Sequence, residues 1–570
     1  MIDPNAWKIE KIAVIGPGIV GMPMAAMLAD AGIRIGIDRP ARVVVVQRNS
    51  PTSGWKVAAI NAGRSVIGGV EPELDGIVAR AVAQGLLSAS HAYDDIRDAD
   101  VILVCIQTDR NGFGPDYGPL FEGLDKLARA LRDRPRSKTP LVIFESTLAP
   151  SSMNTVIRDH FRKYGLEEGR DLLLGNSPNR VMPGRLVERV ADSDKLAGGL
   201  NPLTPQLIAR LYRHIVVRGT IHRTNSLSAE IVKTLENAYR DVRIAYAAEI
   251  ARYCDAHDID FYRVRDEVNR LLSQQDAASR DPNAVPSGGL LVPTIGVGGH
   301  CLPKDGILLL WRMLERRKDL PASLILEARR INDESPREAV WLAEKTFGRL
   351  DGKAVALMGT AYRFNSEDTR NSPTLPLARL LLDKGCRIVL HDPYVKPDDQ
   401  NLKRFGLADC FTRDMGAVLK ESETLIFCTG HHMYLKERSV MKEHGVKLQG
   451  IFDGCNLFDE NPFPGIPYTG IGRGRWVPSP AFVDFVREGF RVMERGLANE
   501  LQDAISFANR HYAPDAFNRV SFREVQRIAG TCVTGCAIAD PGPVERVPAF
   551  EGFVPRLAAC ARRAWGERAA

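Results

Sequence analysis

No apolar run in this 570-residue sequence is long enough to cross a lipid bilayer, and the first residues do not form an apolar segment. A membrane-spanning helix needs about 20 consecutive apolar residues, and a secretory signal needs an apolar core close to the start. Residues 7–11 instead alternate apolar and charged side chains and lead directly into a strand pattern. The sequence therefore predicts a cytoplasmic protein that has no membrane partner.

The chain also lacks a strong excess of charge of either sign. Its 76 Lys and Arg residues exceed its 70 Asp and Glu residues by 6. In so long a chain this excess is too small to indicate nucleic-acid binding. A hydrophobic content of 44% and a charged content of 26% are ordinary for a globular protein. At roughly 150 residues per domain, the length indicates three or four domains.

Cysteine pairs with the spacing of a zinc site are missing as well. The ten cysteines are spread over the whole chain. Cys532 and Cys536 lie close together in sequence, but their surroundings do not supply the two further ligands that a structural zinc ion needs. A chain of this size does not depend on disulfides for its stability. We therefore expect reduced thiols and no metal ion.

What the sequence does contain is a glycine-rich turn near its start. A strand pattern over residues 12–15 leads into the turn, and a helical pattern over residues 22–29 follows it. In a dinucleotide-binding fold the first glycine permits a tight turn, the second lets the backbone approach the pyrophosphate, and the third lets helix and strand pack closely. A purely structural turn is the alternative. The expected cofactor contacts are Gly16, Gly18, Ile19, Val20 and Gly21.

The second expected strand, residues 41–46, ends without the acidic residue that normally binds the ribose hydroxyls of NAD. Gln47, Arg48 and Ser50 follow it instead. A guanidinium and a hydroxyl group at this place suit a 2′-phosphate, so NADP is an alternative to NAD. If the strand register is different, these are only solvated turn residues.

Polar residues follow two further expected strands. Thr108 comes after residues 100–106, and Glu145 and Thr147 come after residues 141–144. Because ligands of open parallel sheets bind beyond the carboxyl ends of the strands, these side chains are candidates for an active site. Helix capping is the alternative for Thr147.

The middle of the chain is predicted to be helical. Apolar residues recur at spacings of three and four from Ser226 to about Asp258, which indicates one long helix. Lys233 and Asn237 are four residues apart and share one face of it. Taken alone, such a pair is usually a solvated surface feature.

The segment from Gly296 to Asp305 places a thiol in a glycine-rich loop. Three glycines precede Cys301, and their lack of a Cβ would let a bulky substrate lie against the main chain. Pro303 stiffens the end of the loop, and Asp305 adds a carboxylate near the sulfur. Cys301 is therefore a candidate nucleophile for a carbonyl group. The alternative is a cysteine that is only a small buried apolar residue.

A further helical stretch is expected over residues 307–331, after which strand and helix patterns alternate again. We expect an α/β protein in which two Rossmann-like domains flank a central helical region, followed by a C-terminal extension of unassigned role. The later strands are expected at residues 352–359, 387–392, 424–429 and 450–453, and the helices of the extension near residues 482–512 and 553–565. The expected domains are residues 1–200, 201–335, 336–477 and 478–570.

Several motifs in this chain occur in the order found in one enzyme family. They are the glycine turn, Glu145 to Thr147, Ser177 and Pro178 with Pro183 and Gly184, Ala229 to Asn237, Gly296 to Asp305, Ala361 to Arg363, Asp368 to Pro373, His391 to Tyr394, and Gly470 to Gly474. Over roughly residues 10–475 the chain resembles the UDP-glucose/GDP-mannose dehydrogenase family, most closely its branch that oxidises UDP-N-acetylmannosamine. His300 is typical of that branch, whereas Pro303, Lys304 and Asp305 are more typical of the glucose and mannose branches. The resemblance therefore does not identify the sugar.

The resemblance implies an NAD-dependent oxidoreductase that oxidises the C6 alcohol of a nucleotide sugar twice, yielding a uronic acid for polysaccharide biosynthesis. Lys233 would hold the charge of the alkoxide, and Asn237 would donate to the same oxygen. Cys301 would then attack the aldehyde, and the thiohemiacetal would be oxidised to a thioester. A water molecule held by Asp305 and Thr147 would release the acid.

The resemblance also implies binding residues and partners. A UDP-sugar is expected rather than a GDP-sugar, and pairing of the central helices implies a homodimer or a larger homo-oligomer. Glu145 completes the expected catalytic set. The expected cofactor contacts beyond the glycine turn are Arg48, Thr108, Thr147 and Arg370. The expected substrate contacts are Arg180, Lys233, Asn237, Gly298, Gly299, Tyr362 and Arg363.

Two positions depart from the family pattern. Asn179 stands where the family has a Glu that acts as an acid and base late in the reaction, and an amide cannot exchange a proton at neutral pH. Either Glu145 or Asp305 substitutes for it, or the thioester step is slow. Arg363 replaces a common Lys, which keeps the cation but changes its geometry. The alternatives are therefore an NADP-linked enzyme that stops at the aldehyde, or a catalytically impaired protein that binds sugar nucleotides.

Overall fold

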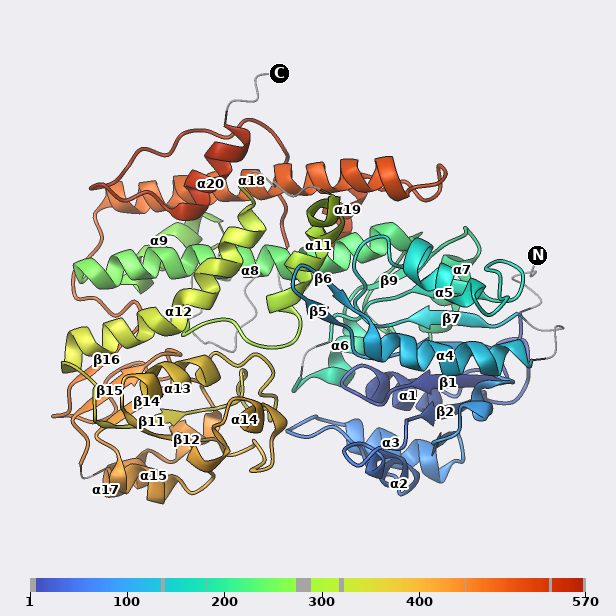
Figure 1. Ribbon diagram of the computed structural model, residues 1–570, viewed down its shortest axis with the longest axis horizontal. Coiled ribbons are helices and arrows are strands. Elements are labelled where there is room, and N and C mark those ends of the chain that lie inside the picture. Colours follow the sequence, from blue (N-terminus) through green and yellow to red (C-terminus); the bar gives the residue numbers. More distant parts are fainter. Residues whose placement is uncertain are drawn as a thin grey trace. The chain divides into compact units, whose positions relative to one another are not determined.

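The computed structural model describes residues 7–134, 139–181, 183–272, 289–316, 322–445, 447–532 and 536–566 (Figure 1). The chain divides into two compact units, and each unit gathers segments that are distant in sequence. The first unit contains Met1–Glu236, Ile307–Lys318 and Gln502–Cys532, and the second contains Asn237–Gly306, Asp319–Leu501 and Val533–Ala570. Each unit therefore includes part of the C-terminal extension.

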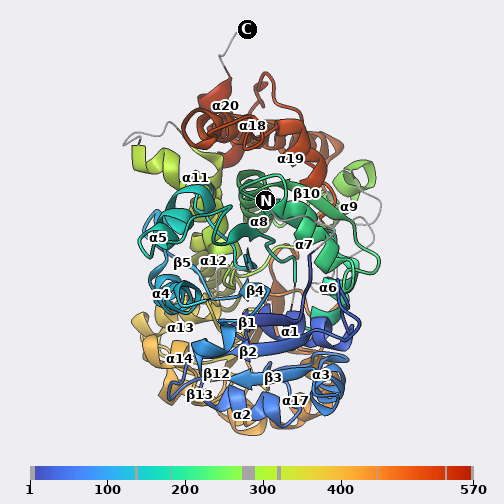
Figure 2. The ribbon, with the colours of Figure 1, turned by 90° about the vertical axis from the view of Figure 1, so that its right-hand side faces the viewer.

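A mostly parallel sheet forms the centre of the first unit, with the strand order β10-β9-β8-β7-β4-β1-β2-β3. Of these pairs, β8 and β9 are antiparallel. Figure 2 shows β4, β1, β2 and β3 of this sheet one below the other. Alternate residues of β1 enter opposite cores, because Ile12 and Val14 pack on one face and Ala13 and Ile15 on the other. The strands are β1 (Lys11–Ile15), β2 (Arg42–Val46), β3 (Leu87–Ser90), β4 (Val101–Val104), β7 (Leu141–Phe144), β8 (Leu173–Asn176), β9 (Lys195–Gly199) and β10 (Ile221–Asn225).

Helices cover both faces of this sheet, as a parallel sheet requires. They are α1 (Gly21–Asp30), α2 (Trp55–Asn61), α3 (Leu74–Ala83), α4 (Gly118–Arg132), α5 (Arg158–Arg162), α6 (Leu186–Asp192) and α7 (Thr204–Tyr212). A small hairpin of β5 (Asp109–Asn111) and β6 (Gly114–Asp116) precedes α4. The strands expected at residues 41–46, 100–106 and 141–144 are confirmed as β2, β4 and β7.

The central helices agree with the sequence in one part and differ in another. The long helix is confirmed as α8 (Ser226–His257), and α9 (Phe261–Leu272) follows it. The single helical stretch expected over residues 307–331 is wrong, because the structure has α11 (Leu302–Arg316) and α12 (Leu324–Phe347) there. Ser323 caps the start of α12 by accepting a hydrogen bond from the amide of Leu326 at 3.2 Å. The sequence does carry a signal for this break, because residues 315–319 are all charged and Pro321 follows them.

A second parallel sheet lies in the second unit, with the strand order β13-β12-β11-β14-β15-β16. The expected strands are confirmed as β11 (Ala354–Met358), β12 (Arg387–His391), β14 (Thr424–Phe427) and β15 (Gly450–Asp453), and β13 (Phe411–Thr412) and β16 (Tyr468–Gly470) add the edges. The helices are α13 (Thr374–Asp383), α14 (Gln400–Arg404), α15 (Met415–Glu421), α16 (His432–Lys436) and α17 (Arg438–His444).

The C-terminal extension is helical. Its first and last helices, α18 (Pro480–Tyr512) and α20 (Arg556–Trp565), lie where the sequence predicts helices, and α19 (Phe522–Ala529) was not predicted.

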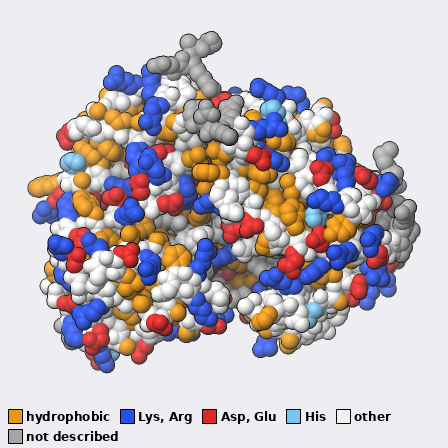
Figure 3. All heavy atoms as spheres, in the orientation of Figure 1, with side chains coloured by type: hydrophobic (Ala, Val, Ile, Leu, Met, Phe, Trp, Pro, Cys, Tyr) orange, Lys and Arg blue, Asp and Glu red, His pale blue; other side chains and the backbone are white. Residues whose placement is uncertain are grey.

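On the face shown in Figure 3, basic and acidic side chains are interspersed, in keeping with the near balance of charge in the sequence.

Several expected absences can be compared with the described residues. None of the helices described combines the length and the apolar character that a bilayer crossing requires. All ten cysteines lie in the described ranges, and none of them forms a disulfide. Within the same ranges, no group of three or more His, Cys, Asp or Glu side chains is arranged to hold a metal ion.

Candidate active site

The glycine turn lies at the carboxyl end of β1 and opens α1. Gly16 has a φ of +91°, and a Cβ there would lie 3.0 Å from the carbonyl oxygen of Cys105. A Cβ on Gly21 would overlap the carbonyl oxygen of Gly16, whereas no heavy atom lies within 4 Å of the Cβ position of Gly18. Gly18 therefore leaves open space before the helix N-terminus, where a pyrophosphate fits.

The position that normally binds the ribose of NAD carries no acid. β2 pairs in register with β1 and β3 up to Val46, so Gln47 is the first residue beyond the strand. Gln47 Nε2 donates to Ser53 Oγ at 2.8 Å. Arg48 Nη1 lies 3.2 Å from Glu122 Oε2 of α4, so the cation expected at this site is partly neutralised by a neighbouring carboxylate.

Thr108 and Thr147 meet beyond the carboxyl ends of β4 and β7. Thr108 Oγ1 donates to the carbonyl oxygen of Thr147 at 2.7 Å, which ties the two loops together. Thr108 is buried, and Thr147 is half-buried, like Ile19 and Val20 of the glycine turn. The carboxyl ends of β1, β4 and β7 share one edge of the sheet, so these residues line the edge where open parallel sheets bind ligands.

In the second unit, α8 and the start of α11 are joined by a buried polar chain. Asn237 Nδ2 donates to Asp305 Oδ2 at 2.6 Å, and Lys304 Nζ lies 2.6 Å from Asp305 Oδ1. Asp305 is fully buried, and Lys304 is nearly so. Lys233, one turn before Asn237 in α8, is also buried rather than solvated. Because burying a charged side chain is costly without polar partners, a buried Lys and a buried Asp indicate that their surroundings stabilise charge.

Cys301 occupies the N-cap position of α11. Its carbonyl oxygen accepts hydrogen bonds from the amides of Lys304 at 3.1 Å and Asp305 at 2.9 Å. The side chain of Cys301 is exposed, whereas the other nine cysteines are buried or half-buried. The interpretation of Cys301 as a buried apolar residue is therefore wrong. A thiol at the start of a helix is stabilised as the thiolate by the helix dipole, which makes it more nucleophilic.

The glycines before Cys301 have a different use from the one that the sequence predicts. A Cβ on Gly299 would lie 2.8 Å from the ring of Tyr362, a Cβ on Gly298 would overlap the side chain of Tyr362, and a Cβ on Gly296 would lie 2.9 Å from Pro373. These glycines let the loop that carries Cys301 pack tightly against residues 362–373. Tight packing of this loop, rather than open space for substrate, explains them.

Hydrogen bonds hold the same two loops together. The amide of Gly299 donates to the carbonyl oxygen of Arg370 at 2.8 Å, and Asn371 Nδ2 donates to the carbonyl oxygen of Gly299 at 3.0 Å. Arg370 Nε lies 2.9 Å from Asp368 Oδ1. Burial lowers the pKa of Arg370, but the hydrogen bond and charge of Asp368, with a contribution from Cys301, raise it overall. The guanidinium of Arg370 is thus paired with Asp368 and lies close enough to interact with the thiol.

Comparison with known proteins gives this arrangement a family. Profiles of the UDP-glucose/GDP-mannose dehydrogenase family match residues 10–216 as its NAD binding domain, residues 227–334 as its central domain and residues 356–460 as its UDP binding domain. A UDP-N-acetyl-D-mannosamine dehydrogenase from Pyrococcus horikoshii is 31% identical over 470 residues, which are 81% of this chain and 99% of that relative. This chain belongs to the UDP-glucose/GDP-mannose dehydrogenase family.

Other relatives agree with the assignment. An NDP-N-acetyl-D-galactosaminuronic acid dehydrogenase from Ralstonia solanacearum is 29% identical over 433 residues, 75% of this chain and 92% of that relative. The crystal structure of an NDP-N-acetyl-D-galactosaminuronic acid dehydrogenase from Methanosarcina mazei Go1 has a TM-score of 0.65 at 30% identity and covers 82% of this chain and 96% of its own. The structure of the Pyrococcus horikoshii UDP-D-ManNAc dehydrogenase has a TM-score of 0.66 at 30% identity, covering 81% and 99%. Family membership makes the chain an NAD-dependent oxidoreductase of nucleotide sugars.

Asn179, which replaces the Glu that the resemblance leads one to expect, is part of a buried cluster in the first unit. Its Nδ2 donates to Glu145 Oε2, and its Oδ1 lies 3.1 Å from Lys195 Nζ. Glu145 also accepts from the hydroxyl of Tyr212 and lies 2.9 Å from Lys195 Nζ. The Glu145 carboxylate is thus a buried charge paired with Lys195. It is not placed as the water-activating base that the sequence suggests as a substitute.

Arg180, expected to bind substrate, has other partners in this structure. Its guanidinium pairs with Glu236 of α8 and donates to the carbonyl oxygens of Asp194 at 3.0 Å and Ile528 at 3.2 Å. It also donates to Thr531 Oγ1 at 3.2 Å. The side chain is almost fully buried by these contacts. In this structure Arg180 therefore joins the polar loop after β8 to the C-terminal extension.

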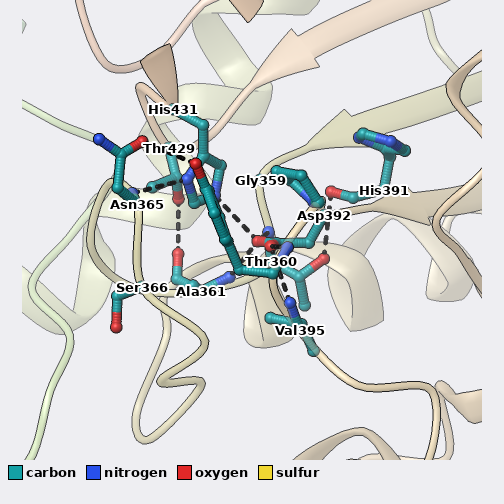
Figure 4. A network of polar contacts seen from close by, with 12 residues as sticks. Gly359, Thr360, Ala361, Asn365, Ser366, His391, Asp392, Val395, Thr429 and His431 are labelled. Atoms are coloured by element: carbon teal, nitrogen blue, oxygen red, sulfur yellow. Dashed lines mark hydrogen bonds and ion pairs between the residues drawn. The ribbon is translucent and has the colours of Figure 1, made fainter. Parts of the chain in front are cut away.

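Figure 4 shows a buried network at the carboxyl ends of β11, β12 and β14. Asp392 accepts hydrogen bonds from the amides of Thr360 at 2.8 Å and Ala361 at 2.9 Å, and it lies 3.0 Å from His431 Nε2. The other ring nitrogen of His431 accepts from the amide of Asn365 at 2.9 Å. Both nitrogens of the imidazole are therefore engaged, so this pair cannot serve as a catalytic Asp-His base.

The network has a positioning role instead. Burial raises the pKa of Asp392, but the hydrogen bond from His431 and the backbone amides outweigh this and lower it overall. A stable carboxylate at this place fixes the turn that follows β11, and Tyr362 is the next residue along the chain. In a dinucleotide-binding turn such amides face a phosphate, whereas here they face Asp392. Arg363, the next residue, lies over the ring of Phe364 with its guanidinium carbon 4.7 Å from the centroid.

Some residues of these clusters were not predicted. Lys195, Tyr212 and Glu236 contact expected site residues but belong to no motif that the sequence reveals. Lys195 did carry a signal, because it is a charged residue at the start of the buried strand pattern of β9. A buried Lys needs an anionic or hydrogen-bonding partner, and Glu145 was already one of the predicted site residues.

Proposed function

We propose that this enzyme oxidises the C6 alcohol of a UDP-N-acetylhexosamine to the uronic acid through a covalent intermediate on Cys301. The observation that carries the proposal is the exposed Cys301 thiol at the start of α11. It is followed in the chain by the buried ion pair of Lys304 and Asp305, and Asp305 also accepts a hydrogen bond from Asn237. Neither a simple alcohol dehydrogenase nor a sugar-nucleotide binding protein needs a nucleophile so placed.

The turn after β1 fits NAD. The open space at Gly18, the left-handed Gly16 and the start of α1 suit a pyrophosphate, and Thr108 and Thr147 lie at the same edge of the sheet. When bound, NAD supplies the hydride acceptor for each oxidation. Arg370 was expected to contact the cofactor, and in the structure its half-buried side chain is paired with Asp368.

The first oxidation needs a group that stabilises the alkoxide. Lys233 supplies a positive charge in a buried setting, where its effect on an oxyanion is stronger than in water. Asn237 has two amide hydrogens, and one of them is used by Asp305. The second would donate to the sugar oxygen. The bond between Asn237 and Asp305 fixes the orientation of that amide.

The second oxidation would begin at Cys301. Its thiolate adds to the aldehyde carbon, and protonation of the carbonyl oxygen gives a thiohemiacetal. Loss of a hydride from carbon and a proton from oxygen converts this adduct to a thioester. Water then breaks the carbon–sulfur bond, which yields the carboxylic acid and restores the thiol. Asp305 and Thr147 are the residues proposed to orient that water.

The substrate contacts proposed here are Tyr362 and Arg363, together with Lys233 and Asn237, whereas Gly298 and Gly299 pack against Tyr362. The UDP binding domain supports UDP as the nucleotide, and the names of the relatives in two genera favour an N-acetylhexosamine. A uronic acid of this kind is a precursor for polysaccharide biosynthesis. A homodimer formed through the central helices is expected from the resemblance.

A panel of UDP- and GDP-linked sugars, each tested with NAD and with NADP, examines this proposal. We expect reduced cofactor with a UDP-N-acetylhexosamine and NAD, and a product whose mass is that of the uronic acid. A product that is the aldehyde would instead favour the second candidate, an NADP-linked enzyme that stops after one oxidation. Gln47 and Arg48 at the ribose position are the observation behind that candidate.

A further inference from the structure

The C-terminal extension lies outside what this chain shares with its relatives. The UDP binding domain match ends at residue 460, and 81% of this chain accounts for 99% of the Pyrococcus horikoshii relative. The extension contributes α18, α19 and α20, and α18, with 33 residues, is slightly longer than α8, with 32. A segment of this length that has been added to a complete enzyme needs a role of its own.

In the second unit, α18 runs antiparallel to α8 along a stripe of tyrosines spaced seven residues apart (Figure 1). Tyr239 donates to Glu494 at 2.7 Å, and Tyr246 donates to the carbonyl oxygen of Val486 at 2.7 Å. Tyr253 stacks on Phe482 with ring centroids 5.1 Å apart. The residue numbers of these contacts increase along α8 while those of their partners decrease along α18. The two helices therefore run antiparallel.

Glycine lets the two helices approach. A Cβ on Gly489 of α18 would overlap the hydroxyl group of Tyr246. A Cβ on Gly496 would lie 2.6 Å from both Ala561 of α20 and Leu324 of α12. The pairing of α18 with its neighbours is therefore close-packed and specific, rather than a loose covering of the surface.

Charged side chains anchor the rest of the extension to the same helices. Glu249 of α8 accepts from the amides of Arg556 at 2.7 Å and Leu557 at 3.2 Å, which caps the start of α20. The guanidinium of Arg556 pairs with Glu327 at 2.7 Å and Glu334 at 2.6 Å, both on α12. The extension thus binds both long central helices of the second unit.

These contacts close the surface of α8. All residues from Asn237 to Asp255 are described, and none of them is exposed. Since this segment makes more than five turns, every face of the helix is covered. The outer face of α18 is mostly polar instead, because its exposed residues are Pro480, Ala481, Asp484, Arg491, Arg495, Ser506, Arg510 and His511.

We propose that the C-terminal extension takes the place of a second subunit and closes α8 to pairing with another copy of this chain. A twofold axis perpendicular to a helix pairs it antiparallel with its copy, and α18 provides that arrangement within one chain. The homodimer expected through the central helices would require this extension to leave α8. The proposal does not depend on which sugar the enzyme oxidises.

The native protein tests this directly. We expect sedimentation velocity to give the mass of one chain over a wide concentration range, and amides of residues 237–257 to exchange slowly with deuterium throughout. A dimer whose exchange in residues 237–257 is unchanged when it dissociates on dilution also supports the proposal, since it uses another surface. A dimer in which exchange in this segment speeds up on dissociation overturns it.

A matched pair of variants gives a second test. Gly489→Leu would push α18 away from Tyr246, so we expect faster exchange in residues 237–257 and self-association through the uncovered helix. Arg491→Leu places the same side chain on the exposed face of α18 and should change neither quantity. Unchanged exchange and an unchanged mass in Gly489→Leu would show that α18 does not cover α8, which overturns the proposal.

Discussion

At the scale of single residues, Cys301 differs from the other cysteines because its side chain is exposed and because it lies at the start of α11. We expect Cys301→Ser to lower uronic acid formation by about 10³-fold or more, because a serine hydroxyl without an adjacent base is a poor nucleophile. The first hydride transfer should remain measurable. Rapid-mixing absorbance of reduced NAD, together with product mass, separates the two steps.

The control for this variant is Cys410→Ser, which alters a half-buried thiol in the second sheet domain. It should retain full activity. Unimpaired acid formation in Cys301→Ser would rule out covalent catalysis at this residue.

Asn179 offers a second prediction. From the sequence alone, Asn179→Glu should speed release of the acid, because it restores the acid and base of the family. The structure reverses that expectation, since Asn179 is hydrogen-bonded to Glu145 and Lys195 in a buried cluster. Two carboxylates would then compete for one ammonium group. We expect the free energy of unfolding to fall by on the order of 3 kcal/mol, with no gain in acid formation.

Asn179→Gln is the matched control, because it has the length of Glu without the charge. Thermal unfolding and the rate of acid formation should be measured for both variants. Faster acid formation in Asn179→Glu than in the native enzyme would contradict this account of the cluster.

The cofactor preference depends on Arg48 and Glu122. If Arg48 is to bind a 2′-phosphate, it must give up the ion pair with Glu122. We therefore expect Glu122→Gln to raise kcat/KM with NADP by about tenfold, which corresponds to one charge-assisted hydrogen bond. Adding Arg48→Ala should remove the gain. A strong preference for NAD that neither change affects would show that this pocket does not hold the ribose.

The sequence could predict which residues belong to the site where a motif contains them, but it could not predict which side chains contact one another. The glycine turn, Cys301 and Asp305 follow from spacing and residue type, whereas Asn237 was predicted only from the family resemblance. The partners of Glu145 and Arg180 depend instead on how β9, α7 and α19 pack in space. Lys195 and Tyr212 lie far from Glu145 in sequence, and Ile528 lies far from Arg180.

At the scale of elements, α8 carries a buried carboxyl group that links stability to pH. Burial raises the pKa of Glu230 to about 8, although the amides of Met153 and Ser151 partly oppose this. The folded pKa lies above the unfolded value of 4.5. Between these values the folded protein keeps a proton that the unfolded chain has lost, so this group makes the protein less stable as pH rises.

We expect Glu230→Gln to remove that contribution, which is on the order of 1.4 kcal/mol for each pH unit between the two pKa values. Melting temperatures from pH 5 to pH 9 should fall less steeply in the variant than in the native protein. Some slope will remain, because burial also raises the pKa of Glu249 and Asp255 to about 7. Equal slopes in the two proteins would contradict the assignment to Glu230.

Element types were largely predictable, because strands of continuous apolar residues and a helix with apolar residues at every third or fourth position leave clear patterns. The break between α11 and α12 was missed although the sequence signals it, because residues 315–319 are all charged and Pro321 follows them. The short α19 was missed because eight residues hold too few repeats to establish a period. Its role became visible only through the contact of Ile528 with Arg180.

At the scale of the whole molecule, the two units each combine sheet, central helix and extension segments. The extension therefore belongs to the folded enzyme and is not an appended domain. Its contacts reach α8, α12 and the loop after β8, so we assign it a structural function within the catalytic chain.

The central claim is that one active site carries out both oxidations through Cys301. The most direct measurement is the number of reduced NAD molecules formed for each nucleotide sugar consumed, combined with the mass of the product. The account predicts two reduced NAD molecules for each sugar and a uronic acid, with Cys301→Ser forming no acid. One reduced NAD molecule for each sugar, with the aldehyde as the final product, would contradict it.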